Sequence, residues 1–172
     1  MSIILEISQL SEVYETYFPK IYNYIFYRIL HKQITEDLTS RVFLKAAEKI
    51  HLYNPEKGAI STWLFAIAEN EINDYFRSSK IVMIPFDSLS DSSVLSIDFE
   101  EQSELIKTED RQELYMALSE LDDRTRDIIS QNYFMDKSLR QIAIEKNMNE
   151  HTVSTVHKRG IKTLRKVMQS RR

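Results

Sequence analysis

Residues 35–77 contain two runs with helical spacing and a short turn between them, and this feature constrains the fold most. In the first run, apolar side chains recur at Leu38, Val42, Ala46 and Ile50. In the second run, the spacing returns at Leu64, Ala68, Ile72 and Tyr75. Each run predicts one buried stripe along an α-helix. The turn, Asn54–Gly58, holds the only proline between Pro19 and Pro85 and one of the two glycines, which indicates a shaped connection.

Both predicted helices begin at residues that favour helix capping. Thr35 is expected to cap the first helix, so that Glu36 and Asp37 lie in its first turn, where the helix dipole favours negative charge. Ser61 or Thr62 is expected to cap the second helix, which runs from residue 63 to about residue 77.

One side of the second helix carries a polar stripe. Its members are Asn70, Asn73, Asp74 and Arg77, spaced at i, i+3, i+4 and i+7. Two amides and a guanidinium on one face, next to aromatic side chains, are able to hydrogen-bond and stack against unpaired bases. Taken alone, such a stripe is more often a solvated helix face, and the pattern leaves both interpretations open.

An earlier helix, over residues 11–30, is rich in aromatic side chains. Tyr14, Tyr17, Ile21 and Ile25 fit one inward face, and we interpret this helix as part of a core. Pro19 lacks a backbone donor, so we expect it to kink the helix or to break it into two. Residues 31–33 are expected to form the turn into the next helix.

The formal net charge of −3 conceals an uneven distribution along the chain. Residues 1–77 carry a net charge of −2, residues 78–110 carry −6 and residues 111–172 carry +5. The acidic, serine-containing stretch at residues 78–107 is typical of a linker. It is either a solvated spacer, which we favour, or a mimic of nucleic acid that lies in a basic channel of a partner.

The last part of the chain has the pattern of a helix-turn-helix. A first amphipathic helix begins near Thr108, Asp122 or Asp123 caps a second, and Ser138 caps a third. Ile142 and Ala143 are expected where the third and fourth helices press together. Asn147 occupies the turn position that needs a left-handed backbone, which asparagine tolerates well.

The fourth helix, over residues 150–168, is expected to present a basic outward face. Its inward side is Val153, Val156, Gly160, Ile161 and Leu164, and its outward side is Ser154, Thr155, Lys158, Arg159, Lys162, Arg165 and Lys166. Residues 154–172 hold seven basic residues and no acidic one. Short hydroxyls and an arginine near the front suit base edges, while lysines further back suit phosphates. A solvated basic helix end is the simpler alternative.

Two segments resemble one protein family. DLTSRVFLKAAEKI and YNPEKGAISTWLFAIAENEINDYFR resemble the promoter −10 domain of bacterial RNA polymerase sigma factors of the small extracytoplasmic-function (ECF) type. Residues 117–166 resemble the −35 domain of the same family, in the expected order. The resemblance implies an all-α fold with two small helical domains, at residues 1–77 and 108–172, joined by the acidic linker at residues 78–107.

The resemblance also implies sites. Candidate −10 contacts are Asn54, Lys57, Ser61, Asn70, Asn73 and Arg77. Candidate −35 contacts are His151, Thr152, Ser154, Thr155, Lys158, Arg159, Lys162 and Arg165. The coiled coil of the polymerase's largest subunit would bind Asp37, Ser40, Arg41 and Leu44, and the flap of the second large subunit would bind apolar residues near Ile128 and Tyr133. Family members often carry basic residues where this chain has Ser154 and Val156, and an apolar one at His157, so no promoter sequence follows from this helix.

Other classes of function find little support in the sequence. The chain has no cysteine, and its four histidines show no ligand spacing, so we expect no cofactor, no metal and no enzymatic activity. No apolar run approaches the ~18 residues of a membrane span and no secretory signal is visible, so we expect a cytoplasmic protein. An inhibitory anti-sigma partner is typical of the resembled class. The rival hypotheses are a stand-alone helix-turn-helix regulator and a protein that interacts without binding DNA.

Overall fold

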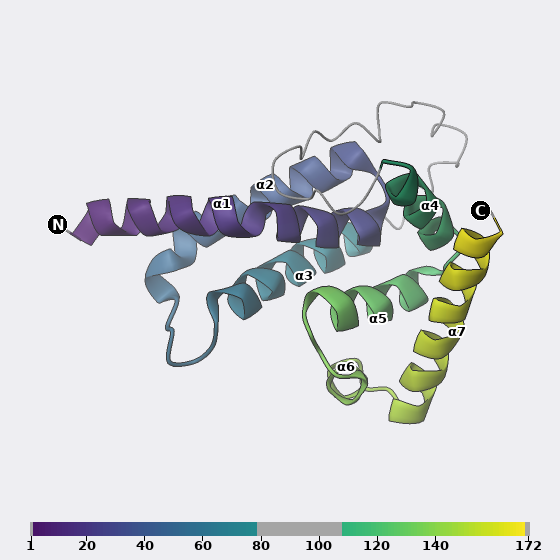
Figure 1. The fold of residues 1–172 in the computed structure, drawn as a ribbon. Helices are drawn as coiled ribbons and strands as arrows, with labels where there is room; N and C mark the ends of the chain where they lie inside the picture. Colours follow the sequence, from purple (N-terminus) through teal and green to yellow (C-terminus); the bar gives the residue numbers. More distant parts are fainter. Residues whose placement is uncertain (1, 79–107, 171–172) are drawn as a thin grey trace. The chain divides into compact units, whose positions relative to one another are not determined.

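The computed structural model describes residues 2–78 and 108–170, which belong to two compact units divided between Asp91 and Ser92. Each unit is considered by itself. Within the described ranges, all regular structure is helical (Figure 1), which confirms the predicted all-α class. Nearly all of the predicted linker, residues 79–107, lies outside the described residues, so its two interpretations stay open.

The first unit packs three helices against one another. They are α1 (Ser2–Ile29), α2 (Lys32–Lys49) and α3 (Ile60–Ser78), with the short 3-10 turn η1 (Ile50–Leu52) after α2. Eight core side chains are at most 1% exposed: Ile21, Tyr24, Ile25, Leu38, Val42, Ala46, Leu64 and Ala68. The predicted inward stripes of α2 and α3 are therefore confirmed, except that Ile50 and Tyr75, at the ends of the stripes, are only half-buried.

Helix α1 begins earlier than expected and continues through Pro19, so of the two effects predicted for this proline the break into two helices is wrong, while the kink stays a prediction. Proline removes one backbone hydrogen bond and costs about 3 kcal/mol in a helix interior. Aromatic packing on both sides offsets this cost: the ring of Phe18 lies 5.0 Å from Tyr14, 6.0 Å from Tyr22 and 5.7 Å from Phe43 on α2. Packing with a second helix thus overrides the local preference.

The predicted caps of α2 and α3 are also wrong. Leu30, at φ 57°, ends α1, and α2 begins at Lys32 with His31 as its cap, which accepts a bond from the Ile34 N–H. Thr35 is fully buried, and its hydroxyl donates to the His31 carbonyl at 2.8 Å. A histidine ring nitrogen can thus supply the capping acceptor in place of the more usual hydroxyl, carboxylate or amide oxygen.

The start of α3 also differs from the prediction. The Trp63 N–H donates to the Ala59 carbonyl, which makes Ile60 the first residue of α3. Ser61 and Thr62 therefore lie inside the first turn of the helix and do not cap it.

The second unit has four helices over residues 108–170, the part that the structure describes. They are α4 (Thr108–Ser119), α5 (Asp123–Phe134), α6 (Leu139–Glu145) and α7 (Glu150–Gln169), and α7 contacts each of the other three. Asp122 caps α5 by accepting from the Thr125 N–H at 2.9 Å, and Ser138 forms a capping box with Gln141 at the start of α6. Both predictions of these caps are confirmed.

The α6–α7 pair is the predicted helix-turn-helix. Ile142 and Ala143 form a core cluster with Ile128 and Val153, and Asn147 has a left-handed backbone at φ 51°. Helix α7 approaches α5 closely at Gly160. A Cβ at this position would lie 2.5 Å from Thr125 Cγ2 and 2.7 Å from Ile129 Cδ1, so the packing requires glycine.

A closed ring of polar contacts, which no local sequence pattern predicts, joins the end of α6 to α5. Gln131, fully buried, donates to Asp127 Oδ1 at 3.0 Å and accepts from Lys137 Nζ at 3.3 Å. Lys137 also pairs with Glu145 at 2.6 Å, and Asp127 pairs with Lys146. Because Glu145 and Lys146 are adjacent in the chain, these contacts form a closed ring. The ring fixes the orientation of α6 relative to α5.

Candidate nucleic-acid interface

The candidate interface of the second unit is the exposed face of α7. Its exposed residues are His151, Thr152, Thr155, Lys158, Arg159, Lys162 and Arg165. Ser154 is half-buried, so of the predicted set it is the least accessible. Asn149 fixes the start of the helix by accepting from the His151 N–H at 2.8 Å. The helix therefore presents these side chains on one face, and whether they bind DNA stays a prediction.

The basic side chains of this face lack neutralising partners. Within the described part of the second unit, no carboxylate pairs with Lys158, Arg159, Lys162 or Arg165. His157, beside them, is half-buried, and burial lowers the pKa of its imidazole, which disfavours a further positive charge. The Thr155 hydroxyl donates to the His151 carbonyl at 2.9 Å and keeps its acceptor lone pairs. The face is a strongly cationic surface.

The candidate interface of the first unit is the polar face of α3. Asn70, Asn73, Asp74 and Arg77 are all exposed, as the stripe predicts. Arg77 forms an ion pair with Asp74 on the same face. The charge of this guanidinium is therefore partly neutralised, and the surface offers chiefly amide hydrogen-bonding groups.

The loop before α3 is held in shape by its own side chains. Asn54 Oδ1 accepts from the Glu56 N–H at 2.8 Å, and the Tyr53 hydroxyl donates to the Gly58 carbonyl at 3.0 Å. The Trp63 ring lies 5.6 Å from the Tyr53 ring, in agreement with a packing role. Part of the hydrogen-bonding capacity of Asn54 is thus used by the turn, while Lys57 extends from it exposed.

A buried carboxylate, that of Glu71, links α3 to α2. Glu71, only 4% exposed, forms an ion pair with Lys45 on α2. The hydrogen bond that Lys45 donates to Glu71 raises the pKa of Lys45. Glu71 was not singled out in the sequence, although its position on the inward side between Ala68 and Ile72 was a usable signal: an acidic residue on a buried stripe needs a partner.

The candidate polymerase-binding face on α2 is solvent-exposed. Asp37, Ser40 and Arg41 are exposed, Leu44 is 61% exposed, and Arg41 pairs with Asp37 at 2.7 Å. Near the predicted flap contact of the second unit, Tyr133 is 75% exposed. Ile128 itself is fully buried in the core, so the predicted flap contact near Ile128 and Tyr133 would have to come from exposed neighbours, and it stays a prediction.

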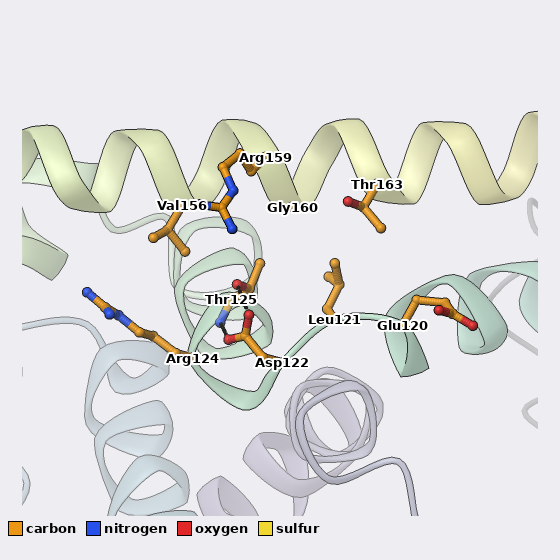
Figure 2. Close-up of a pocket in the computed structure, with 9 residues that line it drawn as sticks. All are labelled: Glu120, Leu121, Asp122, Arg124, Thr125, Val156, Arg159, Gly160 and Thr163. Atoms are coloured by element: carbon orange, nitrogen blue, oxygen red, sulfur yellow. Dashed lines mark hydrogen bonds between the residues drawn. The ribbon is translucent and has the colours of Figure 1, made fainter.

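A pocket of about 440 Å³ lies between the start of α5 and one flank of α7 (Figure 2). Arg124 and Arg159 line it together with Thr125 and Glu120. Asp122, also in its wall, accepts from the Thr125 N–H and hydroxyl, and these bonds lower the pKa of its carboxyl. Arg159 was among the predicted contact residues but Arg124 was not, because the place of Arg124 beside α7 depends on the packing of α5 against α7.

The described residues contain no group of three or more His, Cys, Asp or Glu side chains suited to hold a metal ion. None of their helices combines the length and apolar character that crossing a membrane requires.

Comparison with known proteins matches one family model in each unit. Residues 13–81 match the sigma-70 region 2 family model, and residues 117–166 match the sigma-70 region 4 model. The ECF RNA polymerase sigma factor SigX of Bacillus subtilis is 27% identical over 165 residues, which cover 91% of this chain and 82% of SigX. BldN, an ECF RNA polymerase sigma factor of Streptomyces coelicolor, is 24% identical over 164 residues, which cover 95% of this chain but only 61% of BldN.

A solved structure shows the same fold. The sigma factor RpoE, crystallised in complex with the anti-sigma factor NepR from Bartonella quintana, superposes with a TM-score of 0.66 at 18% identity. The match covers 95% of this chain and 99% of RpoE. With both family models matched in order and ECF sigma factors among its relatives, the chain belongs to the sigma-70 family of RNA polymerase sigma factors, in the extracytoplasmic-function group.

Proposed function

We propose that this chain is an alternative specificity subunit of RNA polymerase, which binds the core enzyme and directs it to promoters with two separate DNA elements. The observation that carries the proposal is the order of the two matched regions together with the unneutralised cationic face of α7. The division of labour follows the predicted domains: residues 1–77 bind polymerase and the −10 element, and residues 108–172 bind the −35 element. In this role the chain acts beside polymerase in the cytoplasm and catalyses no reaction itself.

The −35 element is bound by the front of α7. Lys158, Lys162 and Arg165 are exposed cations that neutralise phosphates, while Thr152 and Thr155 offer short hydroxyl groups to base edges. The orientation of this helix depends on the close α5–α7 packing at Gly160 and on the polar ring that fixes α6. A rigid support of this kind is what a reading surface needs.

The −10 element is bound by the loop at residues 54–60 and by α3. Asn70 and Asn73 project from a helix that is fixed to α2 by the Lys45–Glu71 pair, so their amides are held in place for an unpaired base. Capture of a base in this way contributes on the order of 1–3 kcal/mol to the melted state. Ser61 is half-buried in the first turn of α3 and contributes at the edge of this surface.

Partner proteins bind the exposed surfaces away from these DNA contacts. The α2 face with Arg41 and Leu44 binds the coiled coil of the largest polymerase subunit, and Tyr133 contacts the flap of the second subunit. An inhibitory anti-sigma factor would cover these surfaces. The structure of RpoE with NepR is an example of such a partner for another sigma factor.

Run-off transcription with purified core polymerase tests the proposal. Core polymerase plus the full chain should start transcripts at defined sites on a genomic library from the source organism, and core polymerase alone should not. Asn70→Ala combined with Lys158→Ala should reduce those transcripts while binding to core polymerase persists. Leu44→Ala should weaken binding to core polymerase instead.

The same assay separates the rival function. A stand-alone regulator would bind DNA without core polymerase and would produce no new start site in the absence of another sigma factor. Either that result, or failure of the purified chain to bind core polymerase, would contradict the proposal.

A further inference from the structure

One acidic side chain of the first unit lies on the inward side of α3. Glu71 is buried on the same side of this helix as the apolar residues Ala68 and Ile72. Its partner on α2, Lys45, keeps 44% of its side chain exposed. The ion pair therefore joins a buried carboxylate on α3 to an ammonium group near the protein surface on α2.

Stability alone is a weak reason for a charged pair at this place. Removing a carboxylate from water costs free energy that an ion pair only partly offsets, so apolar side chains of similar volume often stabilise a fold equally well. The surroundings suit apolar side chains, since Ala46, next to Lys45 in the chain, and Ala68, one turn before Glu71, are both fully buried. What an ion pair adds over an apolar contact is direction.

The direction concerns the rotation of α3 about its own axis. Apolar contact is not directional, and small side chains such as Ala46 and Ala68 give two helices little relief with which to interlock. The hydrogen bond from Lys45 to Glu71, in contrast, joins one atom on α2 to one atom on α3. This bond raises the pKa of Lys45, so its ammonium group stays charged at neutral pH. The pair thus fixes how α3 is rotated relative to α2.

The rotation of α3 decides where its amides point. Asn70 directly precedes Glu71 in the chain, Asn73 follows two residues after it, and both asparagines are exposed. Neighbouring side chains of an α-helix project about 100° apart, so the direction of Glu71 sets the direction of Asn70. A rotation of about 10° would move an amide that lies about 5 Å from the helix axis by about 1 Å. A binding site must be held within about 0.5 Å, so this displacement would weaken hydrogen bonds to a base.

We infer that Glu71 is a positioning residue for capture of the unpaired −10 base, because its ion pair with Lys45 sets the rotation of α3 and with it the direction of the Asn70 amide. The inference rests on the proposed function and deepens it, since it assigns the pair to promoter opening and not to stability or polymerase binding. Glu71 is buried and acts through Asn70 and Asn73. An apolar replacement of the pair should therefore keep the fold and lose part of the opening.

The test replaces both charged side chains with apolar ones of similar length. Lys45→Met/Glu71→Met removes the directional bond and leaves no charge without a partner, and methionine adapts to irregular gaps. The full chain, bound to core polymerase, is compared with the wild type on a promoter that the wild-type complex opens. Permanganate reactivity of unpaired thymines measures the opening. The equilibrium constant for opening should fall about tenfold, as expected for loss of one hydrogen-bonded contact to the base. Opening equal to that of the wild type would overturn the inference.

Two further measurements separate positioning from a merely structural role. The melting temperature of the first unit should be at least that of the wild type, and the affinity of the chain for core polymerase should be unchanged. Lys45→Met/Glu71→Leu is a second version of the replacement, for the case in which two methionines pack poorly. If both versions melt below the wild type, the pair supports the fold itself, and the inference fails.

A conservative variant and a matched control sharpen the result. Glu71→Gln keeps a side-chain oxygen that accepts from Lys45, so it should retain most of the opening. A loss as large as that of the apolar pair would mean that direction is not what the pair supplies. Lys49→Met removes an exposed positive charge from the same helix and should leave opening unchanged. An equal loss from Lys49→Met would assign the effect to net charge and would also overturn the inference.

Combination with variants of the amides shows whether the pair acts through them. Asn70→Ala/Asn73→Ala should reduce opening by itself, and adding Lys45→Met/Glu71→Met should cost nothing further. If the two losses add, Glu71 does not act through these amides, and only the present inference fails. If Asn70→Ala/Asn73→Ala leaves opening at the wild-type level, α3 does not read the −10 element, and the proposed function fails with it.

Discussion

The two candidate DNA surfaces of this chain differ in how they carry charge. On α7, the exposed cations have no acidic partner among the described residues, whereas on α3 the one arginine is paired with Asp74. The net charges of the surrounding segments differ in the same way. Residues 111–172, which include α7, carry +5, and residues 1–77, which include most of α3, carry −2. Under the proposed function, the second unit would therefore attract DNA by charge, while the first would depend on hydrogen bonds and on a partner that holds it in place. A net charge for the whole chain hides this difference.

The two glycines show a second difference between the units. A Cβ at Gly58, in the first unit, would meet nothing within 4 Å, whereas a Cβ at Gly160 would collide with Thr125 and Ile129. In the loop of the first unit, the space around Gly58 would therefore accommodate a larger side chain. The second unit uses glycine to bring two helices into contact, so its fold is more sensitive to this one position.

The largest expected effect comes from Gly160→Val, which inserts side-chain atoms between α7 and α5. Overpacking of this kind costs about 1–3 kcal/mol of the free energy of unfolding. Calorimetry should show a lower melting temperature for the second unit and an unchanged one for the first. Gly58→Ala is the matched control and should leave both transitions in place. Equal destabilisation by the two variants would contradict the steric argument.

Lys158→Ala and Asn73→Ala compare the two surfaces directly. Loss of Lys158 should lower the salt slope of promoter binding by about 0.9, because one phosphate contact disappears. Loss of Asn73 should weaken promoter opening without a change in the slope, because its amide carries no charge. Binding of the holoenzyme to promoter DNA over a range of salt concentrations measures both. A lower salt slope of promoter binding for Asn73→Ala would contradict this distinction between the two surfaces.

Asp122→Ala removes the cap that positions α5 and should cost about 1 kcal/mol of stability. Asp122→Asn should recover most of this loss, since asparagine also caps helices. Because bonds from Thr125 lower the pKa of Asp122, its contribution is present above the ordinary value of 3.8 and is lost as the pH falls through the lowered value. Urea unfolding at neutral pH and below about pH 4 should show a smaller difference between wild type and Asp122→Ala in acid.

The smallest effect is expected from Asp74→Asn. The Asp74–Arg77 pair is exposed, with side chains 57% and 75% accessible, so its loss should change stability by less than about 0.5 kcal/mol. The variant frees Arg77 on the α3 face, and the salt slope of promoter binding should become steeper by at most about 0.9. An unchanged slope would mean that Arg77 does not reach a phosphate.

Local signals in the sequence predicted much of the second unit correctly. The caps at Asp122 and Ser138, the left-handed Asn147 and the limits of α7 each depend on residues close in the chain. In the first unit, most of the apolar stripes were predicted correctly, but Tyr14, expected on the inward face of α1, is 45% exposed, and the helix starts were wrong. The start of α2 depends on His31, and the continuity of α1 through Pro19 depends on rings from α2, which no local pattern reveals.

The supporting contacts of the candidate sites were not predictable in the same way. Lys45 and Glu71 are far apart in sequence, and so are Arg124 and Arg159. The buried Gln131 ring depends on the packing of α6 against α5. Helical periodicity shows which side of a helix faces inward, but it does not show which partner lies there. The roles of the predicted contact residues themselves stay predictions.

The separation between the outer face of α7 and the groups that fix it has an evolutionary consequence. Thr152 and Thr155, which the proposed function assigns to base edges, are exposed and take no part in the core or in the polar ring. Substitutions at these positions therefore cost little folding energy. A duplicated copy of this chain would be able to acquire a new target sequence through a few surface changes, without passing through unstable intermediates.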